Sequence, residues 1–417
     1  MFIRVWDRGK PKLKKPSNIK KSKKNNKSKA EISTRTSKLS SSRKFFKGAM
    51  SSLYTESDFT ILLLVAALTM FGVVMVFSAG YYSTLAKSTD AYYFLKRQVA
   101  FAVSGFAILL VFSKVDYHSY SKYYKQIALF SLLMLLLLFT PLGVTVNFAR
   151  RWIFIGPIRI TPSEISKLAM IIFTATYLAE HPNKAKQGIT GMSTILALMV
   201  VHAALIIKQP NLSTAIVIVA IMIGILFVGG LAWKYIVIAF GSLGVGMVSI
   251  LLFFRHTHWY SRLTNWMDPF KDAQGEGYQV SQSIIALGNG GFKGLGLGNS
   301  ISKNLYLPEP QNDFILAIIG EELGFVGIFI MMIVYLVLIW RCIMVSSKAK
   351  DKLGLFMAAG IAIMLGLQVI VNVAVVTASM PATGITLPFV SYGGTSLWVF
   401  MASMGIMLNI SKQGRAK

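Results

Sequence analysis

Residues Phe59–Ser78, FTILLLVAALTMFGVVMVFS, form a run without a charged side chain. A helix of about 20 apolar residues crosses the hydrocarbon core of a bilayer, so this run predicts a membrane-spanning helix. Nine similar runs follow: Val99–Phe112, Ile127–Val146, Ser163–Ala179, Ile189–Ile207, Ser213–Gly230, Trp233–Phe254, Phe314–Trp340, Leu355–Val376 and Leu387–Leu408. Of the 417 residues, 54% are hydrophobic and 14% charged. The sequence therefore predicts an all-α polytopic membrane protein with about ten transmembrane helices.

The first 50 residues differ in composition, with 17 Lys or Arg residues against two acidic residues, Asp7 and Glu31. A segment with this charge and without an apolar run is expected to be disordered. It either anchors the topology, because cytoplasmic segments are rich in Lys and Arg, or attracts anionic lipid head groups. Its aromatic residues are not interleaved with the basic ones, which argues against nucleic-acid binding. We therefore predict that residues 1–50 are a basic cytoplasmic tail.

A cytoplasmic tail and ten spans place both termini in the cytoplasm. Residues 51–412 then form the membrane domain, and 413–417 form a short cytoplasmic tail. The polar segment 255–312, between the seventh and eighth runs, is predicted to be a large loop outside the cell. The short loops on the cytoplasmic side carry basic residues such as Lys114 and Lys184, as the distribution of charge in membrane proteins requires.

The outer loop contains the glycine-rich run Gly288–Gly298, GNGGFKGLGLG. No strand pattern precedes this run, so it does not predict a nucleotide-binding loop. Its glycines instead favour tight turns of the backbone close to the membrane surface. Lys293, within the run, is a candidate contact for an anionic head group.

Asp313 ends the polar stretch, directly before the eighth apolar run and after the proline-containing segment Leu307–Pro310. An aspartate in this place is typical of a helix N-cap, where the helix dipole stabilises the negative charge. The same environment would keep the carboxylate ionised at neutral pH, as a proton acceptor requires. Pattern alone leaves both roles open. Glu321 and Glu322, two turns deeper, are expected to line a polar cavity or to pair with basic residues.

Two further groups of charged residues lie near the predicted outer ends of spans. Arg150, Arg151 and Arg159 bring three guanidinium groups together, and guanidinium forks match the oxygens of phosphates. Either a lipid with a diphosphate head or ordinary anionic lipid would suit them. Glu164 and Lys167 lie three residues apart on one helical face. They either neutralise each other or leave the lysine to contact a substrate anion.

Residues Met380–Ser396, MPATGITLPFVSYGGTS, contain two prolines and three glycines at the predicted depth of the membrane. Irregular backbone is tolerated there only where protein or a water-filled cavity satisfies its polar groups. The segment is therefore predicted to be a broken or re-entrant element that forms one wall of a polar pocket. His202, alone on an apolar helix, is expected to be a hydrogen-bonded packing residue.

Six ordered motifs resemble the SEDS family of shape, elongation, division and sporulation proteins. They are ARRWI with PSEISK, QPNLSTA, DPFKDAQGEGYQ, LGNGGFKGLGLGNS, LPEPQNDFILAIIGEELG and PATGITLPFVSYGGTS. The resemblance covers residues 59–409. The runs VMVFSAG and AYYFLKRQ look more like the division member FtsW, or its sporulation relative SpoVE, than the elongation member RodA. Asn211 departs from the aspartate common in the family, so a role there as a base or cation ligand is not expected.

The resemblance implies a peptidoglycan glycosyltransferase that polymerises lipid II at the outer face of the bacterial cytoplasmic membrane, with a septal role in cell division favoured. The family's essential aspartate, in the motif P-E-x-x-x-D-F, falls on Asp313, which implies the general base. The substrate-binding candidates are Arg150, Arg151, Glu164, Lys167, Lys293, Glu309 and Ser391. The implied ligands are lipid II and an undecaprenyl-diphosphate-linked glycan, and the implied partners are a class B penicillin-binding protein and other division proteins.

Several alternatives remain open at this stage. The sequence requires no cofactor, although a divalent cation on the diphosphate is compatible with it. A flippase or another transporter of lipid-linked substrates would also use charged residues and broken helices. The most polar residues, however, lie near the predicted outer surface and not at the membrane midplane. A noncatalytic scaffold, and a role in elongation or sporulation, are the other possibilities.

Overall fold

The structure is a computed structural model of the chain. It describes residues 58–415 except 88–89, 147–148, 157, 185–186, 189, 236, 239–240, 242–243, 246–248, 250–251, 253–265, 273 and 276. The predicted basic tail at 1–50, much of the run Trp233–Phe254 and the start of the loop 255–312 lie outside the described residues. Every described residue belongs to one unit, Leu53–Lys417.

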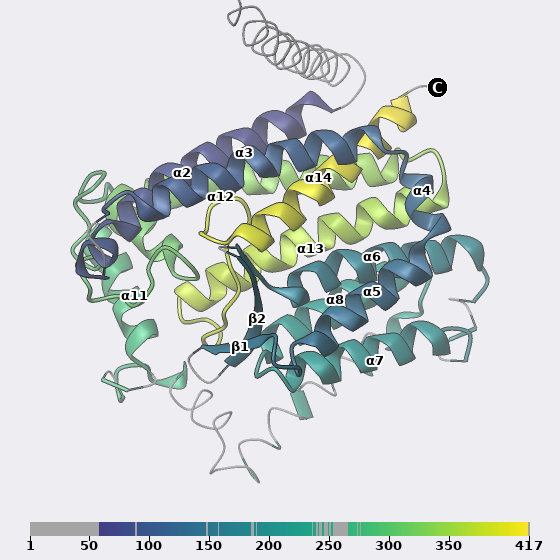
Figure 1. The fold of residues 1–417 in the computed structure, drawn as a ribbon, viewed down its shortest axis with the longest axis horizontal. Coiled ribbons are helices and arrows are strands. Elements are labelled where there is room, and N and C mark those ends of the chain that lie inside the picture. Colours follow the sequence, from purple (N-terminus) through teal and green to yellow (C-terminus); the bar gives the residue numbers. More distant parts are fainter. Residues whose placement is uncertain are drawn as a thin grey trace, which may run out of the picture. The chain divides into compact units, whose positions relative to one another are not determined.

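Helices make up most of the described chain (Figure 1). Those that coincide with predicted runs are α2 (Phe59–Lys87), α3 (Tyr93–Lys114), α5 (Tyr124–Leu137), α6 (Pro162–Glu180), α7 (Ser193–Ile207), α8 (Leu212–Val228), α12 (Ile315–Ser347), α13 (Lys352–Val376) and α14 (Gly394–Arg415). Two shorter helices are α4 (Tyr117–Lys122) and α11 (Tyr278–Gly290). Helix α11 lies within the segment that was predicted to be a loop. The helical class is thus confirmed, with a helix added where none was expected.

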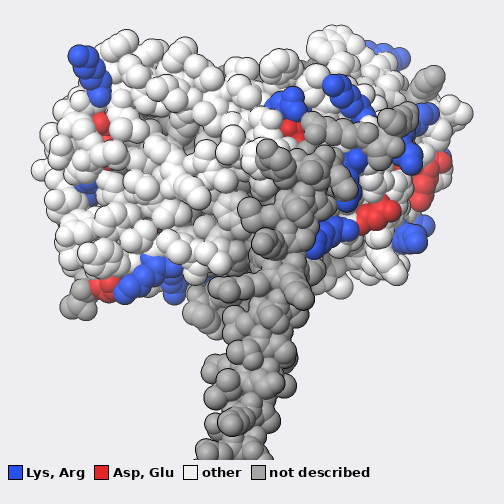
Figure 2. Space-filling view, turned by 90° about the horizontal axis from the view of Figure 1, so that it is seen from above, with Lys and Arg blue, Asp and Glu red and all other residues white. Residues whose placement is uncertain are grey.

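Five described helices, α2, α3, α12, α13 and α14, are long and apolar enough to cross a membrane, and α5, α7 and α8 are shorter apolar helices. The chain is a polytopic membrane protein, and the number of ten spans stays a prediction. Large apolar side chains are exposed along α12, including Phe325, Phe329, Ile333, Leu336 and Trp340. Figure 2 shows charged side chains gathered toward the two sides of one face, with a broad uncharged surface between them. This surface is what a bilayer would cover.

Helix α14 lies at the centre of the bundle. It packs against α3, α6 and α13 (Figure 1). In its most apolar window, 89% of the residues are buried in protein, whereas the value for α12 is 22%. The segment before α14, residues 381–393, has no regular secondary structure, and its residues 385 and 387–391 are buried. The predicted tenth run therefore begins too early, because its first residues belong to the irregular element that the prolines and glycines indicated.

A small antiparallel sheet departs from the all-α prediction. Strands β1 (Gly143–Val146), β2 (Ala149–Ile155) and β3 (Ile158–Ile160) pair in the order β1-β2-β3. The third predicted run was therefore wrong at its end, because α5 stops at Leu137. Pro141 lacks the backbone donor that a continued helix needs. The backbone at Gly143 approaches Leu138 so closely that a Cβ atom would lie 2.0 Å from its carbonyl oxygen.

The glycine-rich run Gly288–Gly298 packs against a break in helix α12. Gly324, inside α12, has a φ of 67° and ends the helical path locally. A Cβ atom on Gly324 would lie 2.3 Å from the backbone nitrogen of Gly294, so both glycines permit this close approach. The carbonyl of Glu321 accepts a hydrogen bond from Leu295 N (2.9 Å), and Phe325 N donates to Gly291 O (2.9 Å). The run therefore supplies the backbone partners that the broken helix lacks.

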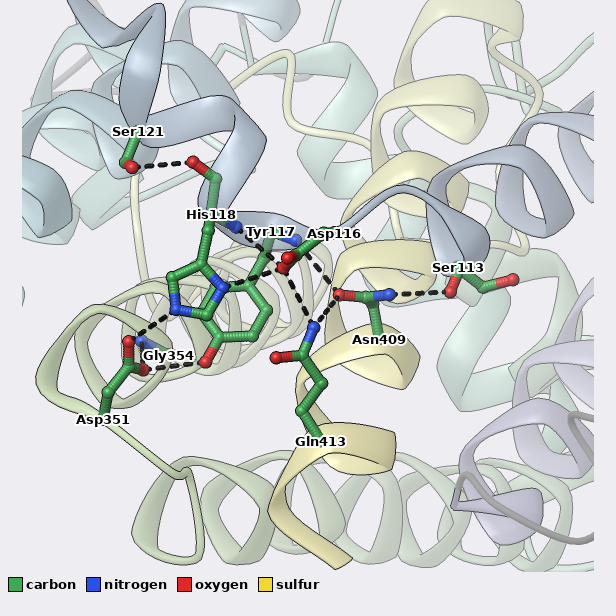
Figure 3. A network of polar contacts seen from close by, with 9 residues as sticks. All are labelled: Ser113, Asp116, Tyr117, His118, Ser121, Asp351, Gly354, Asn409 and Gln413. Atoms are coloured by element: carbon green, nitrogen blue, oxygen red, sulfur yellow. Dashed lines mark hydrogen bonds and ion pairs between the residues drawn. The ribbon is translucent and has the colours of Figure 1, made fainter. Parts of the chain in front are cut away.

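A polar network joins α4, α13 and α14 at the end of the bundle that lies away from the glycine-rich run (Figure 3). Asp116 precedes α4, Asp351 precedes α13 and Asn409 lies near the end of α14. The imidazole of His118 lies 2.8 Å from Asp116 Oδ1 and 2.9 Å from Asp351 Oδ2. Tyr117 OH donates to Asp351 Oδ1 (2.8 Å), and its backbone nitrogen donates to Asn409 Oδ1 (3.1 Å). This end of the bundle is held by hydrogen bonds and charges as well as by apolar packing.

Candidate active site

A cavity of about 750 Å³ lies where four helices begin. Its lining residues come from α2, α11, β2, β3 and the helix entrances, within the ranges 161–164, 210–214, 303–314 and 382–396. These ranges lead into α6, α8, α12 and α14. The N-terminus of a helix carries a partial positive charge, so four such entrances around one cavity favour an anionic ligand. The segment 382–396 forms one wall, as its sequence predicted.

Asp313 lines this cavity two residues before α12 begins. The residue in the N-cap position is Phe314, and no side chain caps the helix, so Asp313 does not have the capping role that its position suggested. Its backbone carbonyl accepts a hydrogen bond of 2.8 Å from Asn372 Nδ2. Among the described residues, no side chain or backbone group donates a hydrogen bond to the Asp313 carboxylate. The backbone of Asp313 is thus held by Asn372, whereas its carboxylate has no hydrogen-bond donor among the described residues.

The surroundings raise the pKa of the Asp313 carboxyl group from 3.8 to about 7. The largest cause is enclosure by protein, which removes water from the charged form, and the negative charge of Glu309 adds to it. Arg151 and Arg159 lower the pKa, and Glu164 raises it. This differs from the ionised group expected from the helix dipole alone, because desolvation outweighs the favourable charges. A pKa near the working pH is suited to a general base.

Arg151 lies next to Asp313 at the cavity wall. Its guanidinium donates to the carbonyl oxygens of Gln209 (3.4 Å) and Pro210, which follow α7. A Cβ atom on Gly384 would lie 3.3 Å from Arg151 Nη1 and 3.5 Å from Asp313 Oδ2. The cation and the carboxylate therefore converge on Gly384, where the missing side chain leaves room between them.

Arg150 is not part of the cavity lining. The pairing of β1 with β2 is irregular here, because Thr145 lies opposite Arg150 and Val144 opposite Trp152, which leaves Arg151 as an extra residue in β2. The Arg150 guanidinium donates to the carbonyl oxygens of Thr140 (2.6 Å) and Gly143 (3.2 Å), which form the turn before β1. Only one of the two adjacent arginines thus reaches the cavity. The expected cluster of three guanidinium groups is divided between the cavity and the turn before β1.

Arg159 and Trp152 form a second basic position in the cavity. The guanidinium carbon of Arg159 lies 4.8 Å from the centre of the Trp152 ring, within the range of a cation–π contact. The backbone carbonyl of Arg159 accepts a hydrogen bond of 3.0 Å from Thr395 Oγ1, at the start of α14. The sheet is thereby fastened to a helix entrance. Arg151 and Arg159 together place two guanidinium groups in the lining.

Glu164 and Lys167 form an ion pair of 2.7 Å in the first turns of α6. The Lys167 side chain is 2% exposed and does not line the cavity, whereas Glu164 does. The first of the two alternatives considered for this pair, mutual neutralisation, matches the geometry. Direct contact of Lys167 with a substrate anion has no support from its position.

The other candidates are divided between the cavity and the surroundings. Glu309 lines the cavity and has a φ of 46°, and its carboxylate accepts a hydrogen bond of 2.6 Å from Asn312. Lys293 is exposed and outside the lining. Ser391 is buried outside the lining, where its hydroxyl accepts a hydrogen bond of 2.8 Å from Leu387 N. Of these three residues, the structure brings only Glu309 to Asp313.

Two sequence-based interpretations of single residues are confirmed. His202 is buried, and its ring nitrogens lie 3.1 Å from Ser131 Oγ and 2.9 Å from the carbonyl oxygen of Leu198. Asn211 lines the cavity and caps α8 by accepting a hydrogen bond of 3.4 Å from Thr214 N. A hydrogen-bonding role therefore remains at the position where the family commonly has an aspartate.

Sequence reasoning missed three residues of this region. Lys303 lines the cavity and pairs with Glu322. Gly384 separates Arg151 from the catalytic candidate, and Asn372 holds the backbone of that candidate. Asn372 could have been found, because an amide in an apolar run is a candidate for a polar contact within the protein.

Metal ligands are not evident in the part of the chain that the structure describes. No three His, Cys, Asp or Glu side chains are grouped there as a metal site would require. The cavity offers guanidinium groups, helix N-termini and the ammonium group of Lys303, which is paired with Glu322, as its positive charges.

The chain matches known proteins along nearly all of its membrane domain. Residues 59–416 match the family described as "Cell cycle protein", which groups FtsW, RodA and SpoVE. The chain is 40% identical over 363 residues to a probable peptidoglycan glycosyltransferase FtsW of Geobacter sp. (strain M18), covering 86% of this chain and 97% of the relative. It is 37% identical over 368 residues to stage V sporulation protein E of Bacillus subtilis, covering 88% and 100%.

Two solved structures share the fold. One, described as "Structural coordination of polymerization and crosslinking by a peptidoglycan synthase complex", has a TM-score of 0.73 and 25% identity, and the match covers 87% of this chain and 99% of that chain. The other, the rod shape determining protein RodA of Thermus thermophilus, has a TM-score of 0.64 and 24% identity with the same coverage. The resemblance drawn from six motifs is confirmed. This chain belongs to the FtsW/RodA/SpoVE family of cell cycle proteins.

Proposed function

We propose that this protein is a peptidoglycan glycosyltransferase that polymerises lipid II into glycan strands. The names of its relatives support this activity, and FtsW relatives favour a role in septal cell-wall synthesis. The single observation that carries the proposal is the arrangement of Asp313. Its carboxylate, with a pKa near 7, faces Arg151 across the open position at Gly384 in the cavity.

The proposed reaction is a single displacement. The C4 hydroxyl oxygen of one lipid II forms a bond to the anomeric carbon of the lipid-linked glycan. The bond between that carbon and the diphosphate oxygen breaks, and its electron pair leaves with undecaprenyl diphosphate. The carboxylate of Asp313 takes the hydroxyl proton, which contributes about 10² to 10⁴ in rate for a well-placed base. Attack opposite the leaving group inverts the anomeric centre.

The leaving diphosphate gains negative charge as the bond breaks. Arg151 and Arg159, together with the N-termini of α6, α8, α12 and α14, supply positive charge at the cavity wall. Such fixed charges stabilise a transition state more than water does, because they need no reorganisation during the reaction. The chemistry uses no resident cofactor. A divalent cation carried by the diphosphate is compatible with it.

The location and partners of the protein follow from the same proposal. The cavity would open toward the outer face of the bacterial cytoplasmic membrane, with both termini in the cytoplasm and the protein at the septum. A class B penicillin-binding protein, together with other division proteins, would use the strands made here. The likeness to a peptidoglycan synthase complex supports such an assembly.

The test compares the wild-type protein with Asp313→Asn in detergent, with purified lipid II as substrate. We expect glycan strands from the wild type and a loss of about 10² to 10⁴ in rate from the variant, since the amide cannot accept the proton. Arg150→Lys, outside the cavity, serves as the control and should polymerise at nearly the wild-type rate. Undiminished polymerisation by Asp313→Asn would exclude the assignment of the base. A flippase without polymerase activity would give no strands from any of these proteins.

A further inference from the structure

Asn372 is a buried amide one turn before the end of α13, on a helix face whose other buried amide is Gln368. It lies on α13 with 1% of its surface exposed. Its Nδ2 atom donates two hydrogen bonds of 2.8 Å each, one to the backbone carbonyl of Asp313 and one to the backbone carbonyl of Ile385. Both hydrogens of the amide are thus used, and both partners belong to segments that line or adjoin the cavity.

The two segments joined by Asn372 form adjoining parts of the cavity wall. Asp313 ends the wall that leads into α12, and Ile385 lies in the irregular wall before α14. Gly384, directly before Ile385, is the residue on which the Asp313 carboxylate and Arg151 converge. A further bond of 2.9 Å, from Tyr392 N to the carbonyl of Gln311, joins the same two walls. The spacing between base and cation therefore depends on these cross-wall bonds.

We propose that Asn372 is a positioning residue for Asp313, an inference that rests on the proposed glycosyltransferase activity. The amide fixes the peptide of Asp313 relative to the adjoining segment around Ile385, and Asn372 itself lies outside the cavity lining. Two carbonyl acceptors require a side chain with two donors, which asparagine provides and aspartate or leucine does not. A displacement of about 1 Å at a reacting group costs on the order of 10²-fold in rate.

The chain provides a matched control on the same helix. Gln368 lies one turn before Asn372, so both side chains point to the same side of α13. Gln368 is fully buried, and neither its Oε1 nor its Nε2 has a hydrogen-bond partner among the described residues. Replacing Gln368 by leucine therefore removes a buried amide of the same kind without touching either wall. A loss of activity seen in the Asn372 variants but not in Gln368→Leu would come from the loss of the two hydrogen bonds of Asn372.

The experiment compares the wild type, Asn372→Leu, Asn372→Ser and Gln368→Leu, each purified in detergent, in lipid II polymerisation across a range of pH. We expect Asn372→Leu to lower kcat by about 10- to 100-fold with KM nearly unchanged, because the base is displaced and the binding groups remain. The pH at which activity is half-maximal should also shift, because the pKa of Asp313 depends on its enclosure. Gln368→Leu should retain both wild-type values.

The outcomes separate the two proposals. An inactive wild type would mean that the glycosyltransferase proposal fails, whatever the variants do. An active wild type with an Asn372→Leu protein of unchanged kcat and unchanged pH midpoint would overturn the positioning role. An equal loss in Gln368→Leu would overturn it too, because loss of any buried amide would then suffice. Thermal unfolding checks the fold. If Asn372→Leu does not fold, the smaller Asn372→Ser, which introduces no extra volume, is judged by the same two readouts.

Discussion

The side chains of Lys303 and Glu322 form an ion pair of 2.8 Å in which 3% and 0% of their surfaces are exposed. Ser78 of α2 donates a hydrogen bond of 2.6 Å to the same carboxylate oxygen and accepts one of 3.1 Å from the ammonium group. Glu322 lies two residues before the break at Gly324 in α12, and Lys303 belongs to the cavity wall. The pair therefore ties the cavity to the interrupted helix and to α2. The expected pairing of Glu322 with a basic residue is thus confirmed.

Removing one partner of this pair should be more harmful than removing both. We expect Lys303→Met to lower the free energy of unfolding by about 3 to 5 kcal/mol, because Glu322 would be left buried without a counter-charge. The double variant Lys303→Met with Glu322→Gln should regain much of this loss. Denaturant midpoints of the purified proteins measure both effects. Additive losses in the double variant would show that the two charges do not depend on each other.

The two adjacent arginines should differ in what their loss affects. Arg151→Ala removes a cation from the cavity, so we expect polymerisation to fall by about 10²- to 10³-fold, as for other fixed donors near developing charge. Arg150→Ala leaves the carbonyls of Thr140 and Gly143 without their donor, so the expected effect is a lower Tm with little change in kcat. Steady-state kinetics and thermal unfolding on the same samples distinguish them. A larger kinetic loss in Arg150→Ala would contradict the placement of the two side chains.

The sequence could predict the helices because runs of apolar residues with the length of a bilayer leave few alternatives. It could not predict the sheet, since Ala149–Ile155 is short and lies beside long helical runs. The division of Arg150 from Arg151 accompanies an irregularity in the pairing of β1 with β2 at Arg151, and this became visible only once the sheet was known. The break at Gly324 was missed for another reason. A glycine within an apolar helix pattern gives no sign of the loop that replaces its hydrogen bonds.

The site was predicted unevenly for related physical reasons. Asp313 could be found because a charge at the entrance of an apolar run needs an explanation. Its pKa could not be predicted, since desolvation depends on how tightly the walls close around it. The cross-wall bond of Asn372 joins residues that are 59 positions apart along the chain. No pattern of spacing within a single sequence specifies such a contact.

Activity should rise with pH through the pKa of Asp313. The base accepts a proton only when ionised, so below a pKa of about 7 the rate should fall about tenfold for each unit of pH. Glu309→Gln removes a negative charge that raises this pKa, and the midpoint should therefore move to lower pH. Rates of lipid II polymerisation measured at saturating substrate test both statements. A midpoint that moves upward in Glu309→Gln would contradict the assignment of Asp313 as the titrating group.

The network of Asp116, His118 and Asp351 (Figure 3) should make the stability of the fold depend on pH, whereas Asp313 makes the activity depend on it. Partial burial lowers the pKa of His118, but hydrogen bonds and charges from Asp116 and Asp351 outweigh it, so the pKa is raised above 6.5. Both ring nitrogens face carboxylate oxygens, and only the protonated imidazole can donate to both. The folded state therefore binds this proton more tightly than the unfolded state does.

A proton bound more tightly in the folded state stabilises the fold at low pH. The contribution of His118 should be fully present below its unfolded pKa of about 6.5 and should disappear as the pH rises through the higher folded value. We expect the Tm difference between the wild type and His118→Asn to shrink as the pH rises above about 6.5 and through the higher folded pKa. Asp313 and other groups titrate in both proteins, so their effects cancel in this difference. A constant difference across the range would mean that the imidazole is neutral in the folded protein and that one ring nitrogen lacks a proton to donate.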